Sequence, residues 1–205
     1  MDTRPEFQWW PTIEVESANG VREVSLATRH LMDRKVFIDG SITSTMADCF
    51  LSQMLYLEQD PSEPVTIYIN STGGEINAGL VIYDTIQGSD LKINMICTGM
   101  AASMAALILA GGQKGRRYIL PHSKVMIHEP LIPGGIGGSA SSIKNISDSI
   151  LETRNMVNEI LSVHTGKTID EINEATDHDN YMRAEEAVEF GICDAISRTI
   201  SIDQM

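Results

Sequence analysis

Residues 93–112 read INMICTGMAASMAALILAGG and contain a complete strand-to-helix unit. Ile93–Cys97 is a continuous apolar run, which is the pattern of a strand buried on both faces of a sheet. Small residues follow, and Ser103–Ala110 has the apolar composition of a buried helix that ends at Gly111-Gly112. A buried strand that leads straight into a buried helix favours the α/β fold class.

Strands and helices alternate on both sides of this unit, and repeated β-α-β order predicts a mostly parallel sheet with covering helices. The other strands that we expect are Lys35–Ile38, Val65–Asn70, Tyr118–Leu120, Val125–His128 and Ile192–Ile196. The other helices that we expect begin at Thr45, span Ala78–Gln87 and Ser139–His164, follow the capping pair Thr168 and Glu171, and span Glu185–Phe190. Upstream, the alternating residues Thr12–Glu16 and the turn Asn19-Gly20 predict a β-hairpin.

The helix predicted over Ser139–His164 is long for a small domain. Its apolar positions recur at steps of three and four residues, as on one face of a helix. About 25 residues at 1.5 Å per residue give a length of about 38 Å. We therefore expect this helix to project from the domain and to pack on a neighbouring subunit.

The charge balance argues against a nucleic-acid-binding protein. The chain has 205 residues, and 15 Lys and Arg against 28 Asp and Glu leave a formal net charge of −13. So acidic a chain repels phosphate, and its dense basic patch is limited to Lys114, Arg116 and Arg117. The length suits one domain with a sizeable core.

Three further features predict a cytoplasmic protein. The three cysteines, Cys49, Cys97 and Cys193, have neither the spacing of a zinc site nor that of a disulfide framework, which fits a reducing compartment. The first residues lack the basic and apolar regions of a signal peptide. No apolar run approaches the 18 residues of a membrane span.

The pair Trp9-Trp10 marks either a contact surface or packing on the domain.

Two strand-to-turn junctions carry residues that are suited to chemistry. In the first, the predicted tight turn Ser71–Gly74 either lets backbone N–H groups approach a ligand or is a plain turn. In the second, Ser103 begins a helix whose dipole favours a developing anion. Ser103 is either a nucleophile or an N-cap, because the Gly-x-Ser-x-Gly pattern of a nucleophile elbow is absent.

A serine nucleophile needs a base, and the base needs an acid that orients it. Among the five histidines, His128 ends an apolar strand before a Gly-rich loop, which would place it at a cleft. A structural histidine fits the same position. The candidate acids are Asp170, Asp177 and Asp179, and spacing alone does not choose among them.

Five motifs occur in a fixed order along the chain. They are YINSTGG (68–74), GMAASM (99–104), LPHSKVMIHEP (120–130), HTG (164–166) and AEEAVEFG (184–191). Together they resemble the proteolytic subunit of the Clp protease, ClpP, over about residues 29–197. The chain is therefore identified as a member of the ClpP family, with differences that suggest a divergent paralogue.

This resemblance implies a ClpP- or crotonase-like α/β fold, a spiral of β-α-β units with a projecting handle helix. Residues 1–28 then form an N-terminal axial segment. Residues 29–205 form a single serine peptidase domain, and its handle covers about residues 132–165.

The resemblance also implies roles for individual residues. Ser103 matches the family's nucleophile, His128 its base and Asp179 the acid of its Ser-His-Asp triad. The oxyanion donors fall on the backbone N–H groups of Gly74 and Met104. The substrate-binding residues fall on Ile132, Pro133, Gly134 and Gly135. The subunit then needs no metal or cofactor, because a partner uses ATP and magnesium.

The implied function is that of an ATP-dependent endopeptidase of protein quality control, which degrades unfolded proteins to short peptides. Its subunits form two stacked heptameric rings, a tetradecamer, and a AAA+ unfoldase feeds the chamber. Neither nucleic acid nor membrane is an expected partner. The alternatives are a catalytically weak or regulatory subunit of a mixed barrel and a crotonase-type acyl-CoA enzyme.

Several positions depart from the family pattern, and three of them bear on assembly. Thr66 and Gly88 stand where aromatic residues usually form the docking pocket for the unfoldase. We therefore expect weak docking by this chain alone, or a mixed assembly with a second ClpP-type paralogue. His178 stands where an Arg often helps to stack the rings, which predicts ring stacking that depends on pH near 6–7.

Overall fold

The computed structural model describes residues 11–17, 20–132, 134 and 137–202. The pair Trp9-Trp10 lies outside these residues, so the alternatives for it stay open. The predicted domain boundary between residues 28 and 29 falls inside the helix α1 (Leu26–Met32) and stays a prediction.

The described residues form a mixed α/β structure around a mostly parallel sheet, as predicted. The strands are β1 (Thr12–Ser17), β2 (Gly20–Ser25), β3 (Lys35–Ile42), β4 (Val65–Gly74), β5 (Ile93–Ala102), β6 (Arg117–Ile119), β7 (Lys124–Ile127), β8 (Asn180–Arg183) and β9 (Ala195–Ile196). The helices after α1 are α2 (Ser44–Leu57), α3 (Ile76–Gln87), α4 (Met104–Ala110), α5 (Ala140–Thr165), α6 (Ile169–Thr176) and α7 (Ala184–Phe190).

The sheet has the order β3-β4-β5-β6-β9, and all these pairs are parallel. β5 has two partners on this side, because Met95–Cys97 pairs with β6 and Met100–Ala102 pairs with β7. β7 in turn pairs with β8, which is antiparallel. The buried strand predicted at Ile93–Cys97 is thus the centre of the sheet, and the chain turns into α4 directly after it.

Three strands run further than their sequences predict, and one of them is β5, which continues to Ala102. β3 continues to Ile42 through Asp39-Gly40, and β4 continues to Gly74 through the predicted tight turn Ser71–Gly74. The reason is pairing between strands, since Ser41 and Ile42 lie opposite Gly73 and Gly74 in a parallel ladder. The prediction of a tight turn at Ser71–Gly74 is therefore wrong, and the paired glycines lie in a strand.

The helices agree better with their patterns, although one boundary moves. α2 begins at Ser44, and the side chain of Thr43, not Thr45, accepts the capping hydrogen bond from Met46 N–H. The capping box at Thr168 and Glu171 is confirmed at the start of α6. The helix α1 and the strand β8 were not predicted. No described helix is long and apolar enough to cross a membrane.

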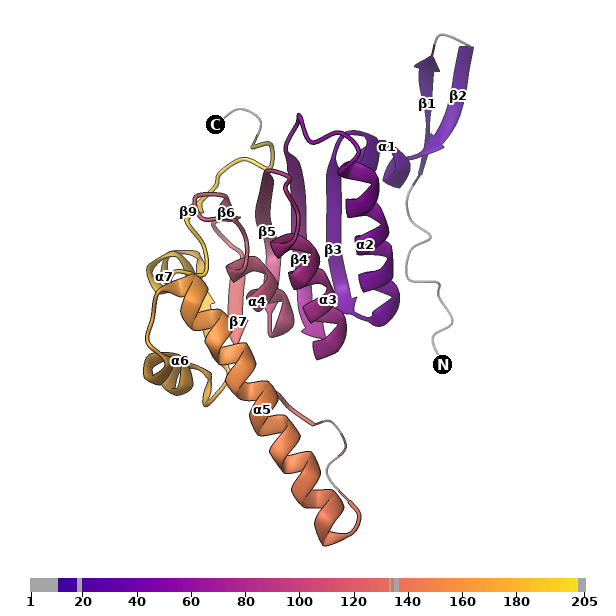
Figure 1. Ribbon diagram of the computed structural model, residues 1–205. Helices are drawn as coiled ribbons and strands as arrows, with labels where there is room; N and C mark the ends of the chain where they lie inside the picture. The colour runs from indigo at the N-terminus through magenta and orange to yellow at the C-terminus, as the bar shows by residue number, and fades with distance from the viewer. Residues whose placement is uncertain (1–10, 18–19, 133, 135–136, 203–205) are drawn as a thin grey trace.

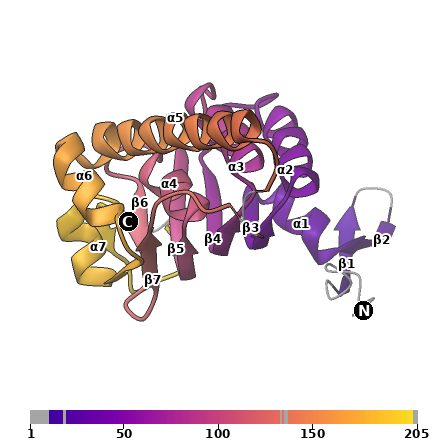
Figure 2. The same ribbon diagram turned by 90° about the horizontal axis from the view of Figure 1, so that it is seen from below.

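The predicted long helix is confirmed as α5, with 26 residues and an N-cap at Ser139. Figure 1 shows its C-terminal end beside α6 and α7, while its N-terminal half extends past the carboxyl ends of β3 and β4. Figure 2 shows α5 running along one side of the sheet and its helices. The β1–β2 hairpin stands apart beyond α1, at the end of the molecule away from α6 and α7.

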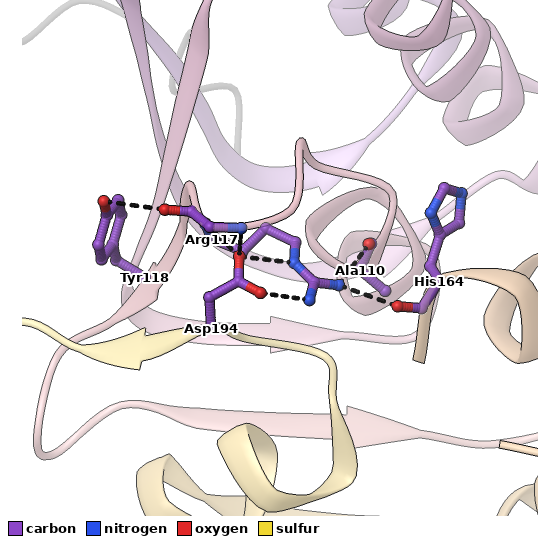
Figure 3. Close-up of polar contacts among 6 residues, drawn as sticks. Ala110, Arg117, Tyr118, His164 and Asp194 are labelled. Carbon is purple, nitrogen blue, oxygen red and sulfur yellow. Dashed lines mark hydrogen bonds and ion pairs between the residues drawn. The ribbon is translucent and has the colours of Figure 1, made fainter. Parts of the chain in front are cut away.

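A buried arginine anchors the C-terminal end of α5 to the sheet (Figure 3). Arg117 is 3% exposed, and its guanidinium donates two hydrogen bonds to the carboxylate of Asp194 at 2.9 and 2.6 Å. It also donates to the carbonyl groups of Ala110 and His164. The Nε2 atom of His164 lies 2.8 Å from the hydroxyl of Tyr83. Arg117, which the sequence placed in a basic patch, is therefore a structural residue.

The Arg117–Asp194 pair predicts a specific loss of stability in acid. Burial by itself would raise the pKa of Asp194, but hydrogen bonds and charge from Arg117, with the Gly115 N–H, lower it overall. A lowered folded-state pKa stabilises the protein above about pH 4, and this stability is lost as the pH falls further.

We expect Asp194→Asn to lower the free energy of unfolding by about 3 kcal/mol at pH 7, because it leaves Arg117 buried without a counter-charge. The loss should shrink below pH 4. Urea titrations at several pH values measure it. Asp148→Asn, which breaks the exposed α5 pair with Lys144, is the control and should cost less than about 0.5 kcal/mol. Equal losses in the two variants would contradict this assignment.

Candidate active site

Ser103 lies at a strained turn between β5 and α4. Its φ of 55° and ψ of −125° fall in a region that residues with a side chain rarely adopt. It occupies the N-cap position of α4, yet its side chain makes no capping hydrogen bond. Its hydroxyl Oγ lies 2.9 Å from Nε2 of His128 instead. The turn therefore has the backbone strain of a nucleophile elbow without the glycine pattern.

His128 directly follows β7, and its side chain is 14% exposed. Its Nδ1 lies 3.4 Å from Oδ1 of Asp179, which is an ion-pair distance, and no described residue makes a hydrogen bond to this nitrogen. The Asp179 side chain is 60% exposed. The structure thus places His128 between Ser103 and Asp179. The serine-histidine pair is close, at 2.9 Å, and the histidine-aspartate pair is longer, at 3.4 Å.

The other two candidate acids lie elsewhere. The Asp177 carboxylate lies 3.5 Å from the ring of its neighbour His178, and Asp170 lies in the first turn of α6. The choice among the acids therefore comes from the tertiary structure, which turns the end of α6 so that Asp179 faces His128.

The end of β4 at Gly73 lies in close contact with the turn at Ser103. A Cβ added at Gly73 would lie 2.7 Å from both Ser103 Cβ and Ala102 O, and 3.1 Å from Met104 N. The φ of Gly73 is +87°, which also favours glycine. A Cβ at Gly74 would collide with the backbone of Ile42. Glycine is therefore required at both positions for β3, β4 and the serine turn to approach one another.

A cleft of about 850 Å³ opens at this point, between the carboxyl ends of the strands and α5. Gly74 and Met104, the two predicted oxyanion donors, line it together with Ser103 and His128. The other lining residues are Ser41, Ile42, Thr43, Glu75, Ile76, Asn77, Pro130, Leu131, Ser149, Thr153 and Val157. The cleft is large and mixed in polarity, which suits a peptide better than a small polar ligand.

The predicted substrate-binding loop is described in part. Ile132 lines a neighbouring hollow with Leu131, Ile76 and residues of α5, and Gly134 is exposed. Pro133 and Gly135 lie outside the described residues.

Sequence reasoning missed a polar network at the bulge between β4 and β5. The side chain of Asn70 donates to Asp39 Oδ1 at 2.9 Å and accepts from Met100 N–H at 3.2 Å. It bridges three strands where the register shifts between Ile69 and Ser71. The Asn in the 68–74 motif is the signal that could have pointed to it.

The described residues offer little for other chemistry. No group of three or more His, Cys, Asp or Glu among them could hold a metal ion. Burial raises the pKa of the Cys97 thiol to about 11, so this cysteine is protonated at neutral pH and is not a competing nucleophile. Burial raises the pKa of the Cys193 thiol further.

The fold and the cleft are those of an α/β protein with a serine-histidine pair at a strained strand-to-helix turn. The family model for the Clp protease matches residues 18–199, which is most of the chain. The chain therefore belongs to the Clp protease family, and it is a peptidase of the ClpP type.

The approach of Gly73 to Ser103 predicts that Gly73→Ala abolishes activity by displacing the serine. We expect the rate of serine labelling by a fluorophosphonate probe to fall at least about a hundredfold, because small displacements of reacting groups have costs of this size. Gly115→Ala is the matched control, since Gly115 has a similar φ of +83° but nothing within 4 Å of an added Cβ. The control should lose some stability and keep its labelling rate. A labelling rate in Gly73→Ala equal to that of the control would refute the steric argument.

Proposed function

We propose that this protein is a serine endopeptidase that cuts unfolded polypeptides within an oligomeric chamber. The observation that carries the proposal is the 2.9 Å contact between Ser103 Oγ and His128 Nε2 at the strained turn in the cleft. A serine used only for structure would cap α4, whereas this hydroxyl is directed to a histidine. Family membership supports the same reaction class.

In this mechanism Ser103 Oγ attacks the carbonyl carbon of the peptide bond while His128 Nε2 takes the hydroxyl proton. Asp179 keeps the imidazole in the tautomer with the proton on Nδ1 and stabilises the imidazolium. His128 then gives its proton to the leaving amine as the C–N bond breaks. Water, activated by His128, cleaves the resulting ester and restores the serine.

The negative charge that develops on the carbonyl oxygen needs hydrogen-bond donors. The backbone N–H groups of Gly74 and Met104 are proposed for this role, and both residues line the cleft beside Ser103. Met104 is also the first residue of α4, where the helix dipole favours an anion. The loss of one such donor typically costs about 10²–10³ in kcat.

Substrate binding is proposed to use the backbone of Ile132, Pro133, Gly134 and Gly135. A backbone edge that pairs with an extended peptide tolerates many side chains, which suits degradation of unfolded proteins. The reaction as written needs no metal or cofactor in this subunit, and ATP hydrolysis with magnesium belongs to a partner.

The proposed assembly is two stacked heptameric rings that a AAA+ unfoldase feeds, formed by this chain alone or with a ClpP-type paralogue. The projecting helix supports it, because Ile143, Leu151 and Met156 on α5 are at least 39% exposed in the single chain. The small, exposed Gly88 supports weak docking of the unfoldase by rings of this chain alone, whereas Thr66 is 6% exposed and offers little surface to a partner.

A regulatory subunit of a mixed barrel is the second candidate. The 3.4 Å separation of His128 Nδ1 and Asp179 Oδ1 favours it, because an acid without a hydrogen bond to the base orients that base poorly. An acyl-CoA enzyme of the crotonase type is less well supported, since it has no need for the serine-histidine pair.

Labelling with a fluorophosphonate probe tests the proposed function. The full-length protein should be labelled at Ser103, and Ser103→Ala should not be labelled. His128→Ala should lower both the labelling rate and the cleavage of an unfolded protein by about 10³-fold or more. Ser123→Ala is the control. Ser123 is buried at the end of β7 opposite to His128, and its hydroxyl donates to Cys97 O. Absence of labelling in the wild-type protein, alone and with a paralogue, would leave the regulatory role.

The proposed assembly predicts that a charge on the projecting half of α5 weakens contact between subunits. We expect Leu151→Glu to reduce the particle size, because Leu151 is 51% exposed on this helix and would be buried in a neighbour. Sedimentation velocity measures the size. Val163→Glu places the same charge near the anchored end of α5 and should leave the particle intact. Particles of unchanged size in Leu151→Glu would remove α5 from the interface.

A further inference from the structure

We infer that one face of α5, formed by Arg154 and Asn158, positions His128 and Asp179 relative to each other. The inference rests on the proposed function, since it assigns positioning residues to the same site. Neither side chain lines the cleft, so they act through the segments that carry the base and the acid. Arg154 and Asn158 are four residues apart and therefore lie on one face of the helix.

Arg154 contacts the segment that carries the base. Its Nε lies 3.3 Å from Oε2 of Glu129, the residue directly after His128. The pair is held by charge, because Arg154 Nε has no hydrogen bond among the described residues. The backbone N–H of Glu129 also donates to the carbonyl of Thr176 at 2.8 Å. Glu129 thus joins the base segment both to α5 and to the last residue of α6.

Asn158 contacts the segment that carries the acid. It is 1% exposed, and its amide Nδ2 donates to Asn173 Oδ1 at 2.7 Å and to Thr176 Oγ1 at 3.4 Å. Thr176 is fully buried and ends α6, three residues before Asp179. Figure 1 shows α5 passing beside α6. The orientation of the turn that leads to Asp179 is therefore fixed against α5 at Asn158.

The burial of Asn158 is costly if its purpose is stability alone. Its Oδ1 atom is buried and has no hydrogen-bond partner among the described residues. A leucine has the same branching and number of side-chain heavy atoms, although it is larger, and it would bury no unpaired oxygen there. What a leucine lacks is the donor that holds Asn173 and Thr176 in one orientation. The residue is thus suited to fix geometry, and the geometry that follows is the position of Asp179.

The two contacts meet at the Glu129–Thr176 hydrogen bond, so α5 supports both sides of the His128–Asp179 pair. This pair is already long at 3.4 Å, so a small shift of either segment separates the two groups. Displacement by about 1 Å can lower a rate about a hundredfold. A shift of α5 should therefore change the distance between His128 and Asp179 through the contacts of Arg154 and Asn158.

The test compares two buried asparagines in the full-length protein. Asn158→Leu should lower kcat for a fluorogenic peptide about ten- to a hundredfold, with KM changed less than about twofold. Asn94→Leu is the matched control, because Asn94 is 3% exposed, accepts a hydrogen bond from Arg116, and lies at the N-terminal end of β5, away from the serine turn. It should lower the melting temperature and leave kcat unchanged.

A double-mutant cycle separates positioning from general damage. In the Asp179→Ala background, Asn158→Leu should lower kcat less than about threefold, because the group that it positions is gone. Full loss in that background, or unchanged kcat in the single variant, would overturn the inference. Wild-type labelling at Ser103 is measured in the same series, so failure of the proposed function shows itself separately.

Arg154 supplies a second variant that does not disturb the core. Arg154→Met keeps the aliphatic stem and removes the charge facing Glu129, and it should lower kcat about three- to tenfold. Arg154→Lys restores the charge and should recover most of this loss. If the lysine variant is as slow as the methionine variant, or if both are as fast as wild type, the ion pair has no positioning role.

Discussion

The close approach of β4 to the serine turn is the constraint on which the site depends. A strand with side chains at residues 73 and 74 could not come near both Ile42 and Ser103. With two glycines it can, and β3, β4 and β5 then end at one edge of the sheet. Because parallel strands share their direction, everything that follows their carboxyl ends meets there, including the N-termini of α2, α3 and α4. The cleft is a consequence of this packing, and the strain at Ser103 is held by it.

The long helix α5 depends on a different set of contacts. Its C-terminal end is held by Arg117, whose single guanidinium joins α4, α5 and the segment before β9. Towards its middle, Asn158 and Arg154 reach the segments around the site. Its N-terminal half has the exposed apolar side chains of Ile143 and Leu151. One helix therefore has a C-terminal end anchored to the sheet, a middle next to the site and an N-terminal half with exposed apolar side chains. A partner that binds this N-terminal half and shifts the helix would also shift the residues next to the site.

Much of the fold could be predicted from local pattern, and the failures have a common cause. The apolar run at Ile93–Cys97, the spacing along α5 and the capping box at Thr168 are local signals, and each is found as predicted. The ends of β3 and β4 were wrong because glycines in a ladder look like glycines in a turn until the opposite strand is known. Arg117 looked like a surface charge because its partner Asp194 is 77 residues away. The acid beside His128 could be named from family resemblance but not from spacing, since α6 decides which carboxylate faces the ring.

The exposure of Asp179 bears on how the subunit works in a proposed ring. A carboxylate that is 60% exposed interacts with the imidazole largely through water, and water weakens the interaction of charges several-fold relative to a protein interior. Its effect on His128 in the single chain is therefore modest, although the serine and histidine are already within hydrogen-bond distance. A neighbouring subunit that covered the turn at residues 177–179 would exclude this water and strengthen the pair without any new residue in the cleft. His178, 89% exposed between the two aspartates, would then lie within the contact. In the proposed ring, subunit contact and alignment of the acid would therefore depend on the same turn, and a subunit on its own should be the weaker enzyme.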